Sequence, residues 1–247
     1  IANPSTERMP RNPHSPSTLF NGMIAPIVPF TLKGFIWYQG ESNRSRAEQY
    51  KTLFPTVIDS WRSQWKKADL PFYYVQLAPF GKNSDGKNSE RQTAPELREA
   101  QMLTLSKSNV GMAVITDIGD EKAIHTPKKK PVGERLALWA LAKDYGYDDL
   151  VHCGPIYKSV NFLKGRALIN FDHVGTGLYS PDKEIRHFEI AGEDGIYYPA
   201  KAKIVGTQIS LASEKVAQPK SVRFGWKNFL QVNLFNKEGL PASSFRT

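Results

Sequence analysis

The stretch that most constrains the fold is Gly34 to Asn43, with the sequence GFIWYQGESN. Four consecutive apolar residues, Phe35 to Tyr38, show no polar alternation, which is typical of a strand buried on both faces in a parallel sheet. The run stops at Gln39, and an amide, a glycine, a carboxylate and a hydroxyl follow within one turn. Because ligand sites in α/β folds lie at the carboxyl ends of parallel strands, we expect a functional site at this turn.

A helix is predicted directly after the turn, because apolar residues recur there at spacings of three and four and mark one helical face. These residues are Ala47, Tyr50, Phe54, Val57, Trp61 and Trp65. Pro55 lies inside the periodic run, so a kink or a break is expected at that point.

Two further units of strand, loop and helix follow. The runs Pro71 to Leu77 and Met112 to Thr116 are predicted as buried strands, and Thr93 to Glu96 has the pattern of a capping box at a helix start. The last helix of the series is expected to open at Pro131. Three such units imply a parallel sheet with helices on its faces. Since three strands leave sheet edges unpaired, we expect further strands from sequence before Ile1.

From about Gly154 the pattern changes to short β-branched or aromatic runs separated by turn residues, which predicts a β-rich module. The turns LKG at 163–165 and VGT at 205–207 are predicted to be hairpin turns. The expected strands are Ile156 to Phe162, Ala167 to Phe171, Phe188 to Ile190, Ala202 to Val205, Gln208 to Leu211 and Ser221 to Trp226.

We therefore predict two domains: a three-layer α/β portion over residues 1–150, incomplete at its amino terminus, and a β-rich accessory module with a carboxyl-terminal tail over residues 151–247. The proline-rich residues 1–33 are expected to be mostly extended, with only Leu19 to Ile27 able to pack. Phe80 to Gln92 is polar and is expected to form a loop beside the site.

Composition excludes several classes of protein. The 247 residues are 40% hydrophobic, which is ordinary for a globular chain, and no apolar run approaches the roughly 20 residues needed to span a bilayer. The net charge of +9 comes from scattered Lys and Arg residues without a nucleic-acid-binding motif, so no nucleic-acid partner is expected. Cys153 is the single cysteine and permits no internal disulfide.

His125 is the leading candidate for chemistry. It follows the third predicted strand, at the same sheet edge as the Gln39 turn, and a loop histidine there could act as a general base. The alternative is an ordinary surface histidine. No cluster of His, Cys and carboxylates has metal-ligand spacing, so no metal is expected.

The turn itself offers two more candidates. Ser42, between a strand and a helix, has the local form of a nucleophile elbow, although Ser42 or Asn43 could equally cap the helix. The Gln39 amide could stabilise a developing oxyanion, or it could simply end the strand. Lys128 to Lys130 precede a helix start, where they could attract an acidic substrate or form a solvated charge run.

Several motifs together resemble the sialate O-acetylesterase family of SGNH-type hydrolases. They cover nearly the whole chain: WYQGESN at 37–43, AEQY at 47–50, LFPTVIDSWR at 53–62, PFYYVQLAPF at 71–80, LREAQ at 97–101, DIGDEKAIH at 117–125, VGERLALWAL at 132–141 and NLFNKEGLPASSFRT at 233–247.

This resemblance implies a serine esterase that removes O-acetyl groups from sugars, typically sialic acids, without metal or organic cofactor, in a secreted or periplasmic setting. His125 matches the family's catalytic histidine, and Gln39 and Gly40 fall in the block that helps to form the oxyanion hole. The family's nucleophile lies in an upstream Gly-Gln-Ser-Asn block that this chain lacks, and Ser42 matches a non-nucleophilic position.

The isolated chain is therefore expected to be one part of an enzyme, completed by an amino-terminal segment or a second chain. The SGNH pattern places Asp three residues before the histidine, where this chain has Lys122. Asp117, Asp120, Glu121 or a backbone carbonyl could orient the imidazole instead, and Glu41 and Ser42 could support the turn. The rival interpretation is a non-catalytic carbohydrate-binding protein that has lost its nucleophile.

Overall fold

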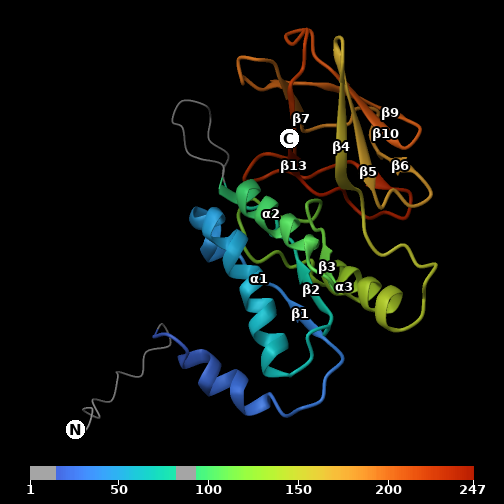
Figure 1. Ribbon diagram of the computed structural model, residues 1–247. Helices are drawn as coiled ribbons and strands as arrows, with labels where there is room; N and C mark the ends of the chain where they lie inside the picture. The colour runs from blue at the N-terminus through green and yellow to red at the C-terminus, as the bar shows by residue number, and fades with distance from the viewer. Residues whose placement is uncertain (1–14, 82–92) are drawn as a thin grey trace.

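The computed structural model describes residues 15–81 and 93–247, which form an α/β part followed by a β-rich part (Figure 1). Strands β1 (Phe35–Trp37), β2 (Phe72–Val75) and β3 (Val110–Ala113) form a parallel sheet in the order β1-β2-β3. The predicted parallel sheet is confirmed, although β3 starts and ends earlier than predicted.

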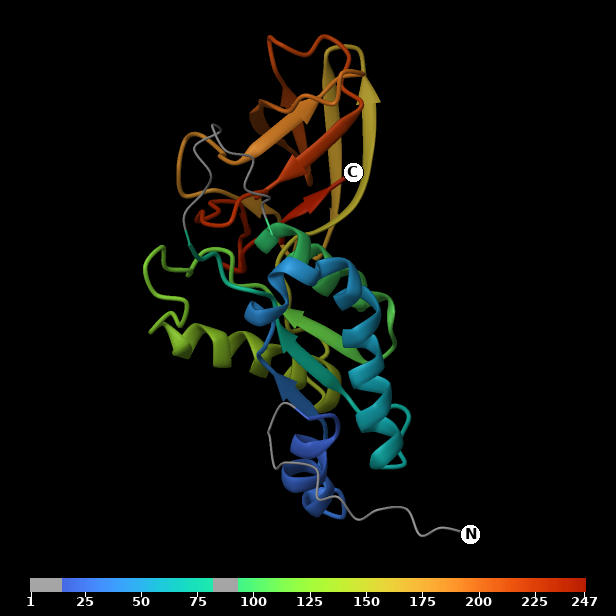
Figure 2. The same cartoon turned by 90° about the vertical axis from the view of Figure 1, so that its left-hand side faces the viewer.

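Helices cover both faces of this sheet. Figure 2 shows α3 (Lys129–Asp144) on one side and α1 (Ala47–Gln64) and α2 (Thr93–Leu103) on the other. A kink or a break was predicted at Pro55; the break is wrong, because α1 runs through this proline as one helix, and the kink stays a prediction. These helices and the sheet make the three layers expected of the α/β part.

Aromatic side chains fill the layer between the sheet and α1. The Phe35 ring lies 5.0 Å from both the Trp61 and the Trp65 rings, and Phe54 meets Tyr74 edge to face at 4.9 Å. Phe54 is almost completely buried, which contributes about 1.5–3 kcal/mol relative to an exposed side chain. The helical face predicted from the sequence is therefore the face that anchors α1 to β1 and β2.

The β-rich part contains two four-stranded sheets and one two-stranded sheet, with the orders β4-β5-β10-β9, β13-β11-β7-β8 and β12-β6. Both predicted hairpins are confirmed, since β4 pairs with β5 and β9 with β10 in antiparallel register. The strands are β4 (Ile156–Leu163), β5 (Arg166–Asp172), β6 (Leu178–Tyr179), β7 (Phe188–Ala191), β8 (Tyr198–Pro199), β9 (Lys201–Val205), β10 (Gln208–Ala212), β11 (Ser221–Phe224), β12 (Phe235–Asn236) and β13 (Phe245–Arg246).

The amino-terminal segment differs from its prediction. Residues 1–14 lie outside the described residues, and the described part contains a π-helix at Phe20–Ile24 and a 3-10 helix at Ala25–Ile27 where a mostly extended chain was predicted. Neither helix has a buried residue; Met23 is 66% exposed, and Leu19 and Ile27 are also exposed. The prolines therefore allow short helices here, and these helices leave several of their apolar side chains exposed to solvent.

The loop predicted at Phe80 to Gln92 lies mostly outside the described residues. The start of α2 also differs from its prediction: Thr93 lies inside the helix, and the Ala94 N–H donates to Asn228 Oδ1 at 3.2 Å. The cap observed on Ala94 thus comes from the β-rich part, 134 positions along the chain. A 3-10 turn, η4 (Thr104–Ser106), ends the segment before β3.

Two apolar clusters form the interior, one in each part. Cys153 is buried and, together with Ile156, packs into the first cluster, so the first core reaches beyond residue 150. The domain division at 150/151 stays a prediction. Within the described residues, no helix has the length and apolar character that crossing a membrane requires.

Candidate active site

The turn after β1 is held in a tight space. A Cβ atom at Gly40 would lie 3.1 Å from Leu97 Cδ2 and 3.3 Å from Gln101 Nε2, which is tighter than most real Cβ contacts. Glycine therefore lets the turn lie directly against α2. A 3-10 helix, η3 (Glu41–Arg46), follows, and the Asn43 N–H donates to the Gly40 carbonyl at 2.8 Å.

The Gln39 side chain is fixed at both ends of its amide. Its Nε2 donates to Asn43 Oδ1 at 2.7 Å, and its Oε1 accepts from the Tyr50 hydroxyl at 3.2 Å. A side-chain amide nitrogen carries two hydrogens, and within the described residues one hydrogen bond is formed by Gln39 Nε2. The arrangement suits a pre-oriented donor.

The Gln101 side chain of α2 is hydrogen-bonded to the backbone of this turn and of the segment after β2. Its Oε1 accepts from the Leu77 N–H at 2.7 Å, and its Nε2 lies 3.3 Å from both the Gln39 and the Val75 carbonyl oxygens. The side chain is fully buried and thus ties the ends of β1 and β2 together. Neither Gln101 nor Tyr50 was singled out by sequence reasoning, although both lie in motifs that carry the family resemblance.

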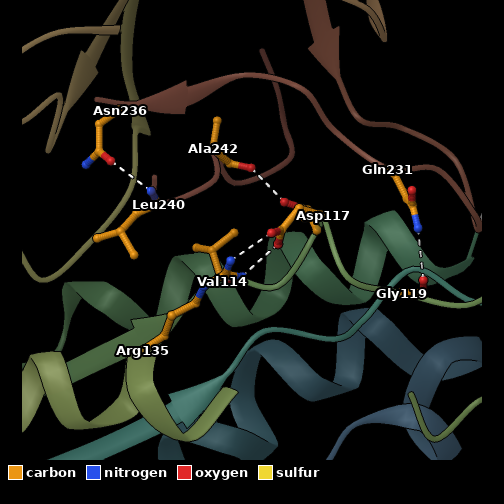
Figure 3. A network of polar contacts seen from close by, with 9 residues as sticks. Val114, Asp117, Gly119, Arg135, Gln231, Asn236, Leu240 and Ala242 are labelled. Carbon is orange, nitrogen blue, oxygen red and sulfur yellow. Dashed lines mark hydrogen bonds and ion pairs between the residues drawn. The ribbon is translucent and has the colours of Figure 1, made fainter. Parts of the chain in front are cut away.

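The loop after β3 carries His125, whose side chain is exposed and has no hydrogen bond to any described residue. The base of the loop is held by the carboxyl-terminal part of the chain (Figure 3). Thr116 Oγ1 donates to the Ala242 carbonyl at 2.9 Å, and Gln231 Nε2 donates to the Gly119 carbonyl at 3.2 Å. The β-rich part thereby positions the loop that presents the histidine.

The two aspartates considered as partners of His125 are engaged elsewhere. Asp117 forms a bidentate ion pair with Arg135 of α3, and both N–O distances are 2.7 Å (Figure 3). Asp120 Oδ1 accepts from the backbone N–H groups of Lys122 and Ala123, which hold the pKa of this carboxyl below its usual value. The group that orients His125 therefore stays a prediction.

One contact joins the two loops of the site. Lys129 Nζ lies 4.8 Å from the centre of the Tyr38 ring, a distance typical of a cation–π interaction. Tyr38 directly precedes Gln39, and Lys129 follows His125 by four positions at the start of α3. Burial and the nearby Glu41 carboxylate raise the Tyr38 pKa to about 12, so the ring stays neutral near pH 7. The contact therefore joins the end of β1 to the start of α3.

Ser42 lies exposed within η3. The cap predicted for it is wrong: the residue before α1 is Arg46, and neither η3 nor α1 has a side-chain cap. The reason is that η3 continues the turn into α1, which leaves no helix start at Ser42. Ser42 also makes no hydrogen bond to His125 in the described structure, so its predicted supporting role stays a prediction.

Two lysines of the run Lys128 to Lys130 have side-chain contacts. The Lys130 side chain forms an ion pair with Glu134 at 3.2 Å, whereas the Lys129 ammonium lies over the Tyr38 ring.

Over residues 15–81 and 93–247, no three His, Cys, Asp or Glu side chains are grouped so that they could hold a metal ion.

Comparisons with known proteins agree on one family. The family described as carbohydrate esterase, sialic acid-specific acetylesterase, matches residues 13–142, more than half of the chain. Human sialate O-acetylesterase is 30% identical, with 94% of this chain and 49% of that protein covered. The mouse protein is 34% identical over 64% of this chain and 32% of its own length.

A solved structure extends the likeness to three dimensions. The crystal structure of a carbohydrate acetylesterase from Xanthomonas citri has a TM-score of 0.87 and 41% sequence identity, covering 93% of this chain and 53% of that chain. The present chain thus spans about half, or less, of the length of the relatives that it matches.

Proposed function

Since this chain belongs to the sialic acid-specific acetylesterase family of carbohydrate esterases, we propose that it is part of a serine esterase that removes O-acetyl groups from sialic acid or related sugars. In this proposal the α/β part is the carboxyl-terminal portion of an SGNH-hydrolase-like domain. The serine nucleophile comes from a segment outside the present 247 residues.

The observation that carries the proposal is the contact between Lys129 and Tyr38. It joins the start of α3, four positions after His125, to the residue before Gln39, and so supports the proposal that a base and an oxyanion donor face the same ester. Acyl transfer through a serine needs these two functions at one place.

The proposed reaction has two halves. The serine hydroxyl attacks the acetyl carbonyl while His125 takes its proton, and the oxyanion accepts hydrogen bonds from Gln39 Nε2 and the Gly40 N–H. When the C–O bond to the sugar breaks, His125 returns the proton to the leaving hydroxyl. Water, activated by the same histidine, then attacks the acetyl-serine and releases acetate.

Replacing His125 tests the base. In the assembled enzyme, His125→Ala should lower the rate of p-nitrophenyl acetate hydrolysis by about 10³-fold, because general base catalysis contributes roughly 10²–10⁴. The side chain is exposed, so the melting temperature should not change. Lys122→Ala, in the same loop, is the matched control and should keep full activity. Near wild-type activity of His125→Ala would remove this residue from the site.

Replacing Gln39 tests the oxyanion donor. Gln39→Ala should reduce kcat by about 10²-fold with a smaller effect on KM, since the hydrogen bond forms mainly in the transition state. A loss confined to KM would make Gln39 a ground-state binding residue. If the assembled wild-type enzyme bound acetylated sugars without releasing acetate, the non-catalytic carbohydrate-binding alternative would replace the esterase.

A further inference from the structure

A small pocket opens on the β-rich part where β7 starts and β11 ends. These two strands pair antiparallel, with Phe188 opposite Phe224, so the residue before β7 lies beside the chain that follows β11. The Gly225 N–H donates to the His187 carbonyl at 3.0 Å and closes this end of the pair. The pocket measures about 120 Å³, and its lining includes His187, Glu189, Pro199, Trp226, Lys227 and Leu230. We call it the β7 pocket.

The lining of the β7 pocket combines apolar and polar side chains. Trp226 and Leu230, both buried, supply apolar surface, whereas Glu189, Lys227 and His187 supply polar groups. A mainly apolar hollow with a few polar groups is the usual form of a small-molecule site. Because sites for drug-sized ligands measure roughly 300–1,000 Å³, this smaller pocket suits a single ring.

The polar groups of the lining favour a neutral ligand. Glu189 is an anion, held by Arg223 at 2.8 and 3.2 Å, and Lys227 is a cation, so the charges of the lining residues balance. Burial is the main cause that lowers the His187 pKa, so this ring is uncharged near pH 7. His187 Nε2 lies 3.1 Å from the Gln231 carbonyl, which can only accept, and Nδ1 of the neutral ring is therefore an acceptor.

The backbone of His187 is also unusual. Its φ is 70°, in the left-handed region that residues other than glycine rarely adopt. Such conformations are found preferentially at functional sites, where the surrounding structure holds them. At His187 the conformation belongs to a residue that lines the β7 pocket.

One residue joins the β7 pocket to the loop of the candidate base. The Gln231 carbonyl accepts from His187, and the Gln231 side chain donates to the Gly119 carbonyl, in the loop that carries His125 (Figure 3). The Asn228 carbonyl likewise accepts from the Phe80 N–H after β2. The segment 226–231 thus both lines the pocket and holds the loops that follow β2 and β3.

We propose that the β7 pocket binds a neutral pyranose ring, the sugar that adjoins the acetylated sugar in a glycan substrate. The choice of ligand rests on the proposed function. Pyranose hydroxyls both donate and accept, as Glu189, Lys227 and His187 require, and the C–H groups of the ring can pack on the Trp226 indole. The Arg246 guanidinium lies 4.8 Å from the centre of the Trp226 ring and fixes its orientation.

A binding experiment on the 247-residue chain tests the pocket directly. The probe is methyl β-galactopyranoside, and binding is followed by NMR at the Trp226 indole N–H and the Lys227 amide. Lys227→Ala removes the exposed ammonium, and His187→Gly removes the imidazole while glycine keeps the positive φ. Lys203→Ala, at an exposed lysine of β9, and His173→Gly, at a second histidine with positive φ, are the matched controls outside the pocket.

The galactoside should shift both wild-type signals. Each pocket variant should weaken binding by about tenfold, since a hydrogen bond to a charged or buried group is worth about that factor, and each control should bind as wild type. Absence of shifts, equal binding by the pocket variants, or stronger binding of free N-acetylneuraminic acid or inorganic phosphate at the same signals would overturn the proposal.

Kinetics of the assembled enzyme separate this proposal from the proposed function. Lys227→Ala should raise KM for an O-acetylated sialyl-galactoside by about tenfold and leave KM for free O-acetylated sialic acid unchanged. An equal change for both substrates would contradict the subsite. Galactoside binding without acetate release from either substrate would keep the sugar pocket and remove the esterase, whereas acetate release without galactoside binding would do the opposite.

Discussion

At the scale of single residues, Gln101 is the side chain that most directly connects the interior with the candidate site. Its amide bonds to backbone groups at Gln39, Val75 and Leu77, which no shorter or apolar side chain can reach together. A buried N–H that loses its partner costs about 1–3 kcal/mol. The position of the Gln39 turn therefore depends on a fully buried side chain of α2.

Gln101→Leu should accordingly act on both stability and rate. We expect it to lower the free energy of unfolding by about 1–3 kcal/mol and to reduce kcat of the assembled enzyme at least tenfold, because small displacements of catalytic groups are costly. Denaturant unfolding and steady-state kinetics measure the two effects. Gln208→Leu, which removes a partly buried glutamine bonded to Asn170 in the β-rich part, is the control and should leave kcat unchanged. A Gln101 variant with wild-type kcat would limit the residue to a structural role.

At the scale of elements, the β-rich part serves as a support for the α/β loops. The Phe80 N–H donates to the Asn228 carbonyl at 3.0 Å, and the Asn228 side chain caps α2. Arg98 of α2 is fully buried and donates to Ser244 Oγ at 3.1 Å and to the Lys227 carbonyl at 2.6 Å. Residues 227–228 and Ser244 of the β-rich part are thus hydrogen-bonded to the α/β part. We expect the position of the site loops to depend on these contacts.

The same elements show how far the sequence carries a prediction. The hairpins at Gly165 and Gly206 and the helical face through Phe54 were predictable, because local periodicity and turn chemistry determine them. The Asn228 cap and the Gln101 bonds were not, since each joins a backbone group to a side chain that is distant in sequence. His125 and Gln39 could be placed at one edge from strand direction, but the Lys129 contact with Tyr38 needed the structure.

The junction between α3 and the β-rich part should make stability sensitive to acid. The rings of His152 and His173 lie 5.5 Å apart, and the His152 ring lies 4.4 Å from the Trp139 ring. Burial is the largest cause that lowers both histidine pKa values, and Lys143 adds to it. The Leu150 carbonyl opposes the shift at His152, and Asp172 opposes it at His173.

The sign follows from which state binds protons first. An unfolded histidine has a pKa of about 6.5, and these two have lower values in the folded chain, so the unfolded state takes up protons first as pH falls. Stability should therefore fall between pH 7.5 and 5.5. In thermal melts, the double variant His152→Gln/His173→Gln should show a smaller fall than wild type, although His187, whose pKa is also lowered, remains. An equal fall in both proteins would exclude the pair as its cause.

At the scale of the whole molecule, the sheet separates two kinds of surface. The carboxyl edge carries Gln39 and the His125 loop, whereas the outer edge of β1 leaves Ile36 open. The carboxyl edge thus carries the proposed base and oxyanion donor, whereas β1 is an edge strand that pairs only with β2 among the described residues.

Ser42 provides the last test, because it decides whether this chain needs an added segment that carries the serine, as the proposed function has it. Ser42 lies exposed in η3, and in the described structure it has no hydrogen bond to His125 that would activate its hydroxyl. A fluorophosphonate probe should therefore leave the 247-residue chain unlabelled and should label only a serine of the added segment once that segment is bound. Ser42→Ala should not change the labelling of the assembly. A probe adduct mapped to Ser42 by peptide sequencing would instead make this chain a self-sufficient esterase with its nucleophile in the turn after β1.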